Sequence, residues 1–365
     1  MDSITHIVLG ATVGEALAGK RLGKKAMLLG AIANSLPDID VVASFWLDTA
    51  HDVEAHRGIT HSFLFVAVVG ALLAWLSGRI WRRDGMSFGR WYFFFGLELF
   101  LHIFLDAFNA YGTGWFEPFS HERIAFNILF VADPFYTLWL VISTLVLLIM
   151  PRGRRARVFW VGFGLVLSSF YLYYAILNKY KIDRIARKEI AKKGIRHTRY
   201  FTTPTPMNTW LWYVVAEDTA GFHTAYISLF DTKYLKGFNL FPKNDSMLAP
   251  LLKHEDVQSL LRFSQGYYTV EKWHGTRPIP TERDTLQVDT LGVTRMGIDT
   301  TAKDTLVFNV LRFEQMKGWE NERARFVFHY FLERPGDNLV ILQRGRFAGW
   351  DEQTFRNFIR RIRGN

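Results

Sequence analysis

The first half of the chain consists of long apolar stretches separated by short polar loops. Six apolar segments can be marked there, with the approximate bounds Ile4–Ala18, Ala26–Leu47, Thr60–Leu76, Trp91–Phe108, Pro134–Met150 and Val158–Leu177. A helix that crosses a bilayer needs about 20 predominantly apolar residues, and the last three segments come close to that length. The pattern predicts an α-helical integral membrane domain of five to six apolar segments in residues 1–180.

The first two segments carry features that a simple span lacks. The first is short and contains Glu15, so we expect it to form a half-span or to pack inside the helical bundle. The second is interrupted by Pro37, which removes a helix hydrogen bond, and Asp38 and Asp40 follow the proline. Irregular backbone at membrane depth is tolerated only where protein or water covers it. This segment therefore predicts a kinked helix beside a buried polar pocket.

Charged and apolar residues intermix after Lys179, as in a soluble domain. We expect an amphipathic helix at about Ile182–Lys193 and a rigid linker at Thr202–Pro206, because the residue before a proline is extended. Runs of β-branched and aromatic residues predict strands at Trp210–Ala216, Thr224–Phe230, Tyr267–Trp273, Thr285–Thr290, Thr305–Phe313 and Phe326–Leu332. Asp351–Ile362 has the periodicity of an amphipathic helix. Residues 181–365 are thus predicted to form a smaller, β-rich α+β domain.

The net charge of +10 is concentrated in short loops beside the apolar segments. The three basic loops are Lys20–Lys25, Arg79–Arg90 and Arg152–Arg157. Basic loops of membrane proteins stay in the cytoplasm, so if all the segments cross, residues 181–365 form an extracytoplasmic domain. The basic run Lys179–Lys193 would also lie outside, which the rule allows because long domains translocate largely regardless of charge. This distribution predicts a multi-pass membrane protein and no nucleic-acid partner.

Histidine and aspartate residues recur at or inside these segments, where an ionisable side chain is costly and by default marks a functional site. His102 and Asp106 are four residues apart, which puts both side chains on one helix face. A glycine permits a turn between His56 and His61, with Thr60 expected to cap the next helix. The candidate metal ligands are His6, Asp38, Asp40, His56, His61, His102 and Asp106.

The absence of cysteine narrows the chemistry of this set. It excludes disulfides and thiolate ligands, and imidazole with carboxylate suits zinc, iron or manganese. A catalytic mononuclear site needs about three protein ligands and an open position, so the surplus residues either support the ligands or bind a second ion. Two ions are suited to phosphoester chemistry. We expect one or two zinc ions, with Asp38 or Asp40 activating bound water and Arg57 binding a phosphate or carboxylate of the substrate.

Each piece also has an ordinary structural explanation. A His-x-x-x-Asp pair is often a contact on a helix surface, and an aspartate after a proline often caps a helix or forms a turn. Asp133 before Pro134 is read as a helix N-cap with proline at the first helical position. The combination favours a metal centre, because all the candidate ligands map to the same side of the membrane.

Taken in order, these motifs resemble those of the YdjM-like family of membrane-bound, predicted metal-dependent hydrolases of bacteria. The resemblance covers residues 1–180 and rests on Thr5-His6, Leu36-Pro37-Asp38-Ile39-Asp40, His56-Arg57-Gly58-Ile59-Thr60-His61-Ser62 and His102-x-x-x-Asp106. It implies a protein of the bacterial inner membrane in which the candidate histidines and aspartates are the metal ligands. It also implies hydrolysis as the reaction class, leaves the substrate open, and carries nothing over to residues 181–365.

The sequence therefore favours a metal-dependent hydrolase that acts at the outer membrane–water interface. Membrane lipid is the expected partner. A phosphoester of a lipid head group or lipid-linked molecule is the first expected substrate, and an amide or carboxylic ester is the second. Two other classes stay open. The same residues also suit a transporter that binds an ion in transit, although no inverted repeat is evident, or a structural metal beside a C-terminal binding module.

Overall fold

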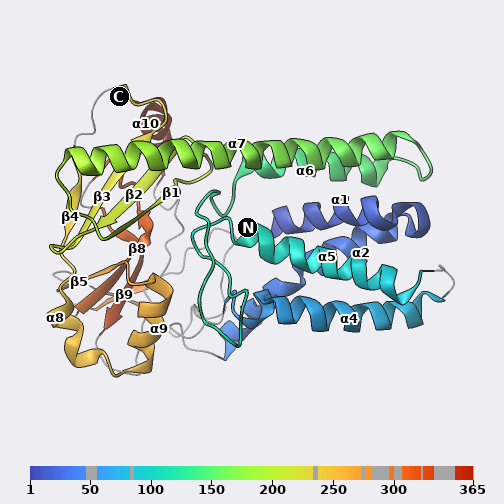
Figure 1. The fold of residues 1–365 in the computed structure, drawn as a ribbon, viewed down its shortest axis with the longest axis horizontal. Helices are drawn as coiled ribbons and strands as arrows, with labels where there is room; N and C mark the ends of the chain where they lie inside the picture. The colour runs from blue at the N-terminus through green and yellow to red at the C-terminus, as the bar shows by residue number, and fades with distance from the viewer. Residues whose placement is uncertain are drawn as a thin grey trace. The chain divides into compact units, whose positions relative to one another are not determined.

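The computed structural model describes residues 1–46, 56–82, 86–232, 237–272, 277–280, 296–299, 306–321, 324–332 and 350–364. The chain forms two compact units (Figure 1). The first, called the helical unit, holds Met1–Phe45, the described residues from His56 to Tyr180, and Thr203–Thr209. The second, called the β-rich unit, holds Lys181–Thr202 and the described residues from Trp210 onward. Each unit has buried hydrophobic clusters of its own.

Helices make up most of the helical unit. They are α1 (Ser3–Leu22), α2 (Lys24–Ser35), α4 (Phe63–Ile80), α5 (Phe88–Asp106), α6 (Pro134–Ile149) and the first part of α7 (Ala156–Lys192), with the short 3-10 helices η1 (Leu36–Phe45) and η2 (Ile59–His61). Among the described residues, α4, α5 and α7 are long and apolar enough to cross a membrane, and α6 is a shorter apolar helix. The expectation of a helical membrane region is thus confirmed, with three candidate spans.

Helices α1 and α2 pack as a tight hairpin. Gly23, at φ 60°, ends α1 and lets the chain reverse into α2. Further along, Gly10 and Gly30 bring the two backbones so close that a Cβ on Gly10 would lie 2.4 Å from the carbonyl oxygen of Gly30. Glu15 of α1 is buried and accepts a hydrogen bond of 2.7 Å from Nε of Arg157. The first apolar segment thus packs inside the bundle, one of the two arrangements that its length and charge predict.

Two helix boundaries agree with the sequence pattern and one differs. Helix α2 ends just ahead of Pro37, and the 3-10 helix η1 carries the chain on. Asp133 caps α6 by accepting backbone hydrogen bonds from its first turn, and Pro134 is the first helical residue, as predicted. The cap of α4 is Ser62 rather than Thr60, because the Ser62 hydroxyl accepts the backbone hydrogen bond from the first turn.

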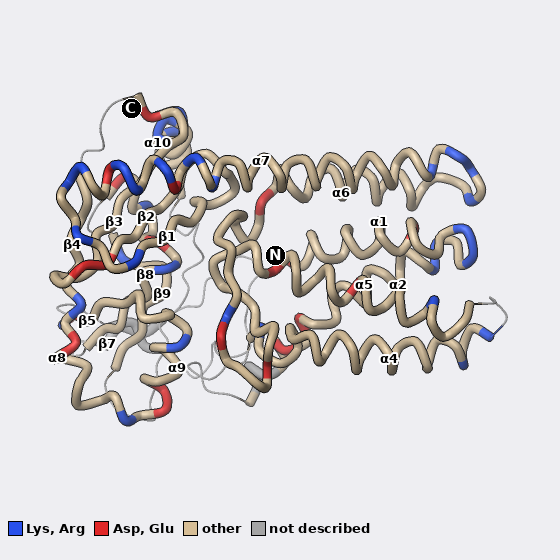
Figure 2. The backbone as a smooth tube through the Cα atoms, viewed as in Figure 1, with Lys and Arg blue, Asp and Glu red and all other residues tan. Residues whose placement is uncertain are grey.

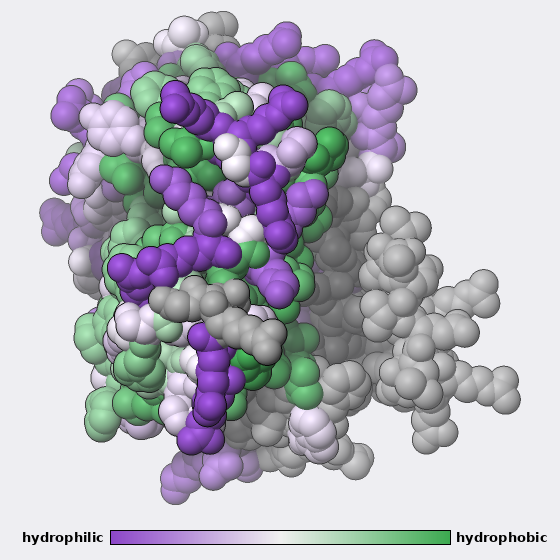
Figure 3. All heavy atoms as spheres, turned by 90° about the vertical axis from the view of Figure 1, so that its right-hand side faces the viewer, coloured by the Kyte–Doolittle hydropathy of each residue, from purple (hydrophilic) through white to green (hydrophobic). Residues whose placement is uncertain are grey.

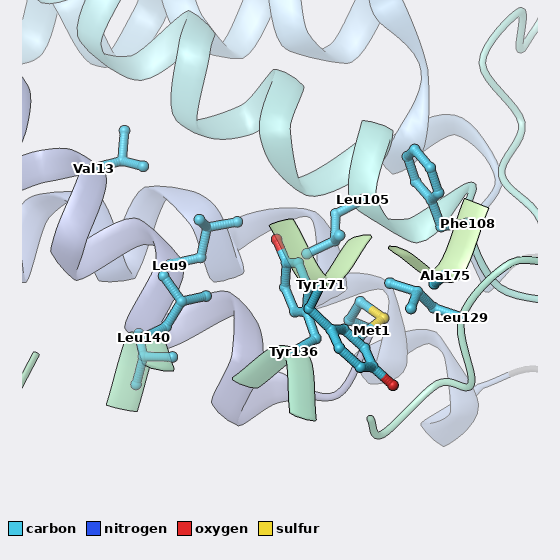
Figure 4. Packing of buried hydrophobic residues seen from close by; sticks show 11 residues of the cluster. Met1, Leu9, Val13, Leu105, Phe108, Leu129, Tyr136, Leu140, Tyr171 and Ala175 are labelled. Atoms are coloured by element: carbon cyan, nitrogen blue, oxygen red, sulfur yellow. The ribbon is translucent and has the colours of Figure 1, made fainter. Parts of the chain in front are cut away.

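A buried hydrophobic cluster joins α1, α5, α6, α7 and the loop after α5 (Figure 4). Its members include Met1, Leu9, Val13, Leu105, Phe108, Leu129, Tyr136, Leu140, Tyr171 and Ala175. Helices inside a membrane associate through close packing and polar contacts rather than through exclusion of water. The cluster fixes the start of α1 against the end of α5, which is where His102 and Asp106 lie.

Two antiparallel sheets and a separate strand pair form the β-rich unit. A four-stranded sheet contains, in order, β1 (Arg199–Pro204), β2 (Leu211–Glu217), β3 (Phe222–Ser228) and β4 (Asn239–Phe241). A three-stranded sheet contains, in order, β5 (Tyr268–Lys272), β8 (Leu306–Gln315) and β9 (Phe326–Leu332), and the strand pair is β6 (Arg277–Pro280) with β7 (Met296–Asp299). The helices are α8 (Asp245–Leu248), α9 (Glu255–Ser264) and α10 (Glu352–Ile362), with the 3-10 helix η4 (Ala249–Leu251).

Strand β2 is buried on both faces of its sheet. Successive side chains of a strand point to opposite faces. On one face Trp212 shares a buried cluster with Ile182 and Ile190 from the end of α7. On the other face Tyr213 shares a cluster with Phe358 of α10. The end of α7 and the C-terminal helix therefore cover the two faces of the four-stranded sheet.

Two expectations for this region need correction. The amphipathic helix expected at Ile182–Lys193 is the end of α7, which continues from the last apolar segment without a break. The linker expected at Thr202–Pro206 begins as part of strand β1, since the extended backbone before a proline also suits a strand. The strand expected at Thr285–Thr290 lies outside the described residues.

Candidate metal centre

Four of the predicted ligands meet where α5 ends. Asp38 comes from η1, His61 from η2, and His102 and Asp106 from the last turns of α5. One ligand atom from each lies within 4.8 Å of the others. The two imidazoles and Asp106 are fully buried, whereas the side chain of Asp38 is 21% exposed. Asp38 is therefore the member of the cluster that solvent reaches.

His61 and His102 approach each other through their Nε2 atoms, which lie 3.1 Å apart. Asp38 Oδ1 lies 3.6 Å from His61 Nε2 and 3.4 Å from His102 Nε2. Asp106 Oδ2 lies 3.5 Å and 3.9 Å from the same two nitrogens. Two imidazole nitrogens and two carboxylate oxygens thus converge, and this donor set suits zinc and related divalent cations.

The hydrogen bonds of the two Nδ1 atoms decide which tautomer each ring adopts. His102 Nδ1 faces the backbone carbonyl of Asn34, which only accepts, so Nδ1 carries the hydrogen. Thr60 donates its hydroxyl hydrogen to Asp40 Oδ2 over 3.0 Å, so the hydroxyl oxygen accepts from His61 Nδ1, also at 3.0 Å. Both Nε2 atoms therefore present lone pairs to each other. That arrangement is repulsive without a cation between the rings, so these residues fit a metal ion.

Asp106 supplies a second observation that fits a metal. Its Oδ2 is buried and accepts no hydrogen bond from any described residue, although Arg57 Nε lies 3.2 Å away as an ion-pair partner. Arg57 is the cation that the structure shows beside this oxygen, and because the oxygen accepts no hydrogen bond from a described residue it keeps a lone pair that a metal ion can take. Oδ1 of the same carboxylate lies 3.1 Å from His6 Nε2 and contacts the α-amino group of Met1. His6 thus reaches the cluster through Asp106 and is not one of the four grouped ligands.

Asp40 holds the turn that carries His61 and lies outside the four-residue cluster. Its Oδ1 lies 3.0 Å from His56 Nδ1, and its Oδ2 accepts hydrogen bonds from the backbone N–H of Arg57 (2.7 Å) and the hydroxyl of Thr60. Arg57 has φ 63°, a left-handed conformation that is unfavourable for a residue with a Cβ. The bonds to Asp40 stabilise this turn. Asp40 and His56 therefore support the candidate ligand His61, in the way that outer carboxylates commonly support ligands at metal sites.

The same contacts set the charge of Asp40 and His61, which lie in η1 and η2, outside the candidate spans α4, α5 and α7. Burial opposes ionisation of Asp40, but the hydrogen bonds from His56 and the Arg57 backbone, together with the electrostatic attraction of His56 and His61, outweigh it and hold the pKa of Asp40 below its ordinary value. Burial lowers the pKa of His61, which precedes α4, to about 3. Asp40 is therefore ionised and His61 is neutral at neutral pH, the form in which an imidazole binds a metal.

The side chain of Arg57 is buried and points toward Asp106. Its Nη1 donates to Asn109 Oδ1 over 2.8 Å, and its guanidinium carbon lies 5.0 Å from the centre of the Tyr111 ring. Its backbone carbonyl accepts a hydrogen bond of 2.9 Å from Gly114, so the loop after α5 binds the turn that precedes α4. Arg57 thus brings positive charge next to a candidate ligand, and its contact with a substrate stays a prediction.

Two further polar residues, outside the sequence motifs, complete the support of the imidazoles. Asn34 of α2 contacts two imidazoles: its backbone carbonyl accepts from His102, and its Oδ1 lies 3.2 Å from His6 Nδ1. Glu98 orients the amide, because its backbone carbonyl accepts from Asn34 Nδ2 at 2.8 Å. Both are polar residues inside apolar segments, the same signal that selected the histidines and aspartates.

Charged residues of the helical unit are separated along its helices (Figure 2). The His/Asp cluster lies where α5 ends and η1 begins. Lys and Arg gather at the opposite ends of the helices, in the α1–α2 turn and just before α7, and hydrophilic side chains gather on that basic end (Figure 3). The candidate ligands and the basic loops are therefore at opposite ends of the bundle.

Comparison with known sequences places this arrangement in a family. The family described as YdjM inner membrane protein matches residues 1–182. The inner membrane protein YbcI of Escherichia coli (strain K12) is 37% identical over 123 residues, which are 33% of this chain and 69% of that protein. The uncharacterized protein YfhP of Bacillus subtilis (strain 168) is 26% identical over 282 residues, which are 73% of this chain and 81% of that protein. No solved structure matches the chain significantly.

Proposed function

Because the chain belongs to the YdjM inner membrane protein family and groups four metal-binding side chains, we propose that it is a metal-dependent hydrolase of the bacterial inner membrane. The observation that carries the proposal is the facing pair of Nε2 lone pairs on His61 and His102, bordered by one oxygen each of Asp38 and Asp106. Zinc is the proposed ion, held by the two imidazoles and Asp106, since three nitrogen and oxygen donors leave the open position that a catalytic zinc needs. Such an ion, when bound, polarises a substrate oxygen and lowers the pKa of a bound water.

Asp38 is the proposed general base. It borders the two imidazoles and its side chain is 21% exposed, so water and substrate reach the site beside it. A carboxylate within hydrogen-bond reach of an attacking water takes its proton, and such catalysis typically contributes about 10²–10⁴ in rate. Asp40 is already engaged by His56, Arg57 and Thr60, so its proposed role is to position His61.

A phosphoester on a lipid or lipid-linked molecule is the proposed substrate. The guanidinium of Arg57, 3.2 Å from Asp106, favours an anionic group at the site. Aliphatic side chains beside the ligands are exposed: Ile39, which follows Asp38 in the chain, is 55% exposed, and Ile59 is 56% exposed. An amphiphile matches both features, because its anionic head suits the guanidinium and its apolar tail suits the exposed aliphatic side chains.

For the orientation, we propose that five to six segments cross the membrane and that the basic loops are cytoplasmic. The basic loops and the His/Asp cluster occupy opposite ends of the same helices (Figure 2), and basic loops tend to stay in the cytoplasm. The metal centre then lies at the outer face, and residues 181–365 form an extracytoplasmic domain. The lipid head groups of the outer leaflet are within reach of such a site.

A hydrolysis screen with the full chain in detergent tests the proposed activity. The substrates are a soluble aryl phosphate, a phospholipid and a carboxylic ester, each with zinc and with a chelator. We expect zinc-dependent cleavage of a phosphoester and its loss in Asp38→Asn, which keeps the size of the side chain but removes the base. Glu122→Gln, the same chemical change at an exposed position of the helical unit, is the control and should keep full activity. Unchanged turnover in Asp38→Asn would overturn the assignment.

Buried Glu98 favours a second candidate, an ion transporter. Its Oε1 accepts no hydrogen bond from a described residue, and its Oε2 accepts from Asn34, so polar contacts extend from the cluster into the bundle. Buried ionisable residues of this kind serve as ion or proton relays in transporters. The test is the flux of metal ions or protons into proteoliposomes that contain the full chain. A flux that is lost in Glu98→Gln, in a protein that hydrolyses no ester, would favour this candidate.

A further inference from the structure

A second surface of interest lies on α7, beyond its apolar stretch. Lys181, Arg184 and Lys188 follow Leu177 along the helix at spacings of three and four residues, so they share one helix face. All three side chains are exposed. None of them forms an ion pair with a residue in the described part of the chain. These three residues are called the basic stripe.

The surroundings leave the charge of the basic stripe uncompensated. The opposite face of this part of α7 is buried, where Ile182 and Ile190 pack on the four-stranded sheet. The neighbouring acids are engaged elsewhere: Asp183 accepts a hydrogen bond of 2.6 Å from strand β1, and Glu189 pairs with Lys192 at 3.4 Å. The stripe therefore presents net positive charge to whatever lies beside the helix.

Position along α7 places the first two residues of the stripe, Lys181 and Arg184, near the level of lipid head groups. Tyr173 and Tyr180 are 57% and 69% exposed, and tyrosines at the end of an apolar helix mark the membrane interface. A helix rises about 1.5 Å per residue, so Lys181 and Arg184 begin about 6 and 10 Å beyond Leu177. The head-group layer on each side of a bilayer is about 5–8 Å thick. Helical side chains lean toward the N-terminus of their helix, which here is back toward the bilayer.

We propose that the basic stripe binds the head groups of acidic phospholipids and anchors the end of α7 at the membrane surface. Each Lys or Arg near an anionic membrane adds about a fivefold preference for it, and the effect fades over a Debye length of about 8 Å. Zwitterionic head groups carry no net charge to match the stripe. The anchor also explains why α7 carries a basic run after its apolar stretch, at the end of the bundle away from the basic loops. The rule that basic loops stay in the cytoplasm does not require basic residues at that end. It holds whether or not the chain is a hydrolase.

Energy transfer in nanodiscs measures the lipid preference of the full chain. The chain has no cysteine, so Ala191→Cys, at an exposed position of α7, carries a single donor dye. The acceptor dye is attached to the acyl chain of either phosphatidylglycerol or phosphatidylcholine, each at trace level in a zwitterionic nanodisc. We expect more transfer to labelled phosphatidylglycerol than to labelled phosphatidylcholine, with the difference shrinking as salt is added.

Substitutions then test which residues cause the preference for phosphatidylglycerol. The combination Lys181→Gln, Arg184→Gln and Lys188→Gln should bring the two lipids to equal transfer, and the single variants should each weaken the preference about fivefold or less. The control combination Arg356→Gln, Arg360→Gln and Arg363→Gln removes the same charge from exposed positions on or directly after α10 and should keep the preference. Circular dichroism checks that each variant is folded.

Three results would overturn the proposal. The first is equal transfer to both lipids in the unsubstituted chain, and the second is a preference that survives loss of the stripe. The third is a preference that is lost equally in the α10 control, which would indicate that the net charge of the protein, and not the basic stripe, causes the preference. Binding of soluble polyphosphate that depends on the stripe, without any preference among lipids, would assign the surface to a soluble polyanion instead.

Discussion

His61 and His102 face each other through Nε2 atoms that lie 3.1 Å apart and both carry lone pairs. They are 41 residues apart in the chain. The Asp40 carboxylate fixes the turn that holds His61, and the backbone carbonyl of Asn34 fixes the ring of His102. Such a pair is repulsive unless a cation lies between the rings, which makes metal binding the first property to test.

Removing either imidazole should abolish stabilisation by zinc. A ligand present at about 100 times its Kd stabilises the folded state by about 2.7 kcal/mol, provided the unfolded chain does not bind it. Thermal unfolding of the detergent-purified chain, with zinc and with a chelator, measures the effect. The zinc-dependent shift should disappear in His61→Ala and His102→Ala and persist in His121→Ala, whose side chain is 71% exposed. A full shift in both cluster variants would contradict the ligand assignment.

Asn34→Ala should weaken metal binding although Asn34 is no ligand. The substitution removes the amide that holds His6 and leaves the backbone carbonyl that holds His102. Loss of an outer support typically lowers metal affinity about 10- to 100-fold. Competition with a chromophoric chelator gives the affinity. Asn178→Ala removes another buried amide of the helical unit, one that donates to a backbone carbonyl at 3.1 Å, and should leave the affinity unchanged. Equal losses in both variants would point to general destabilisation.

The metal-free chain should lose stability as the pH falls below about 6.5, the pKa of a free imidazole. Burial lowers the pKa of His61 in the folded chain to about 3. Between these values the unfolded chain binds a proton that the folded chain does not, so stability falls with falling pH, by up to about 1.4 kcal/mol per unit for this group. Unfolding at stepped pH in chelator measures the slope. His61→Gln should make it shallower, and an unchanged slope would assign the dependence to other groups.

Cysteine labelling tests the proposed orientation. The chain has no cysteine, so a single introduced thiol reports its own side of the membrane. In intact cells an impermeant reagent should label Ser246→Cys, at an exposed position of the β-rich unit, and should label Arg154→Cys, in the basic loop before α7, only after lysis. The reverse pattern would place the β-rich unit in the cytoplasm.

The candidate site could be predicted from the sequence to the extent that it depends on local spacing. The His102-x-x-x-Asp106 pair is set by helix geometry, and both residues lie in the cluster. Spacing alone did not separate His56 from His61, because the outcome depends on a turn with positive φ at Arg57 and on the Asp40 carboxylate that reaches across from η1. Contacts of that kind join distant segments, and a single sequence does not reveal them.

The fold, like the site, could be predicted from the sequence only where it depends on local pattern. Apolar segments predict where helices occur, but not that α7 continues past the apolar stretch to Lys192. No glycine or proline interrupts α7 between Gly164 and its end, so the local propensity for helix persists while the environment changes. The run of aromatic and β-branched residues in β2 predicts a strand, but its burial on both faces depends on Ile182 and Phe358 from distant parts of the chain.

The metal content of the purified chain tests the metal centre most directly. Elemental analysis of chain extracted in mild detergent, without chelator, should find about one zinc or other transition ion per chain, the number that one four-residue site holds. His61→Ala and His102→Ala should each remove that ion, and His121→Ala should keep it. An unsubstituted chain without transition metal, even after incubation with zinc, would contradict a metal centre. So would full occupancy in both cluster variants.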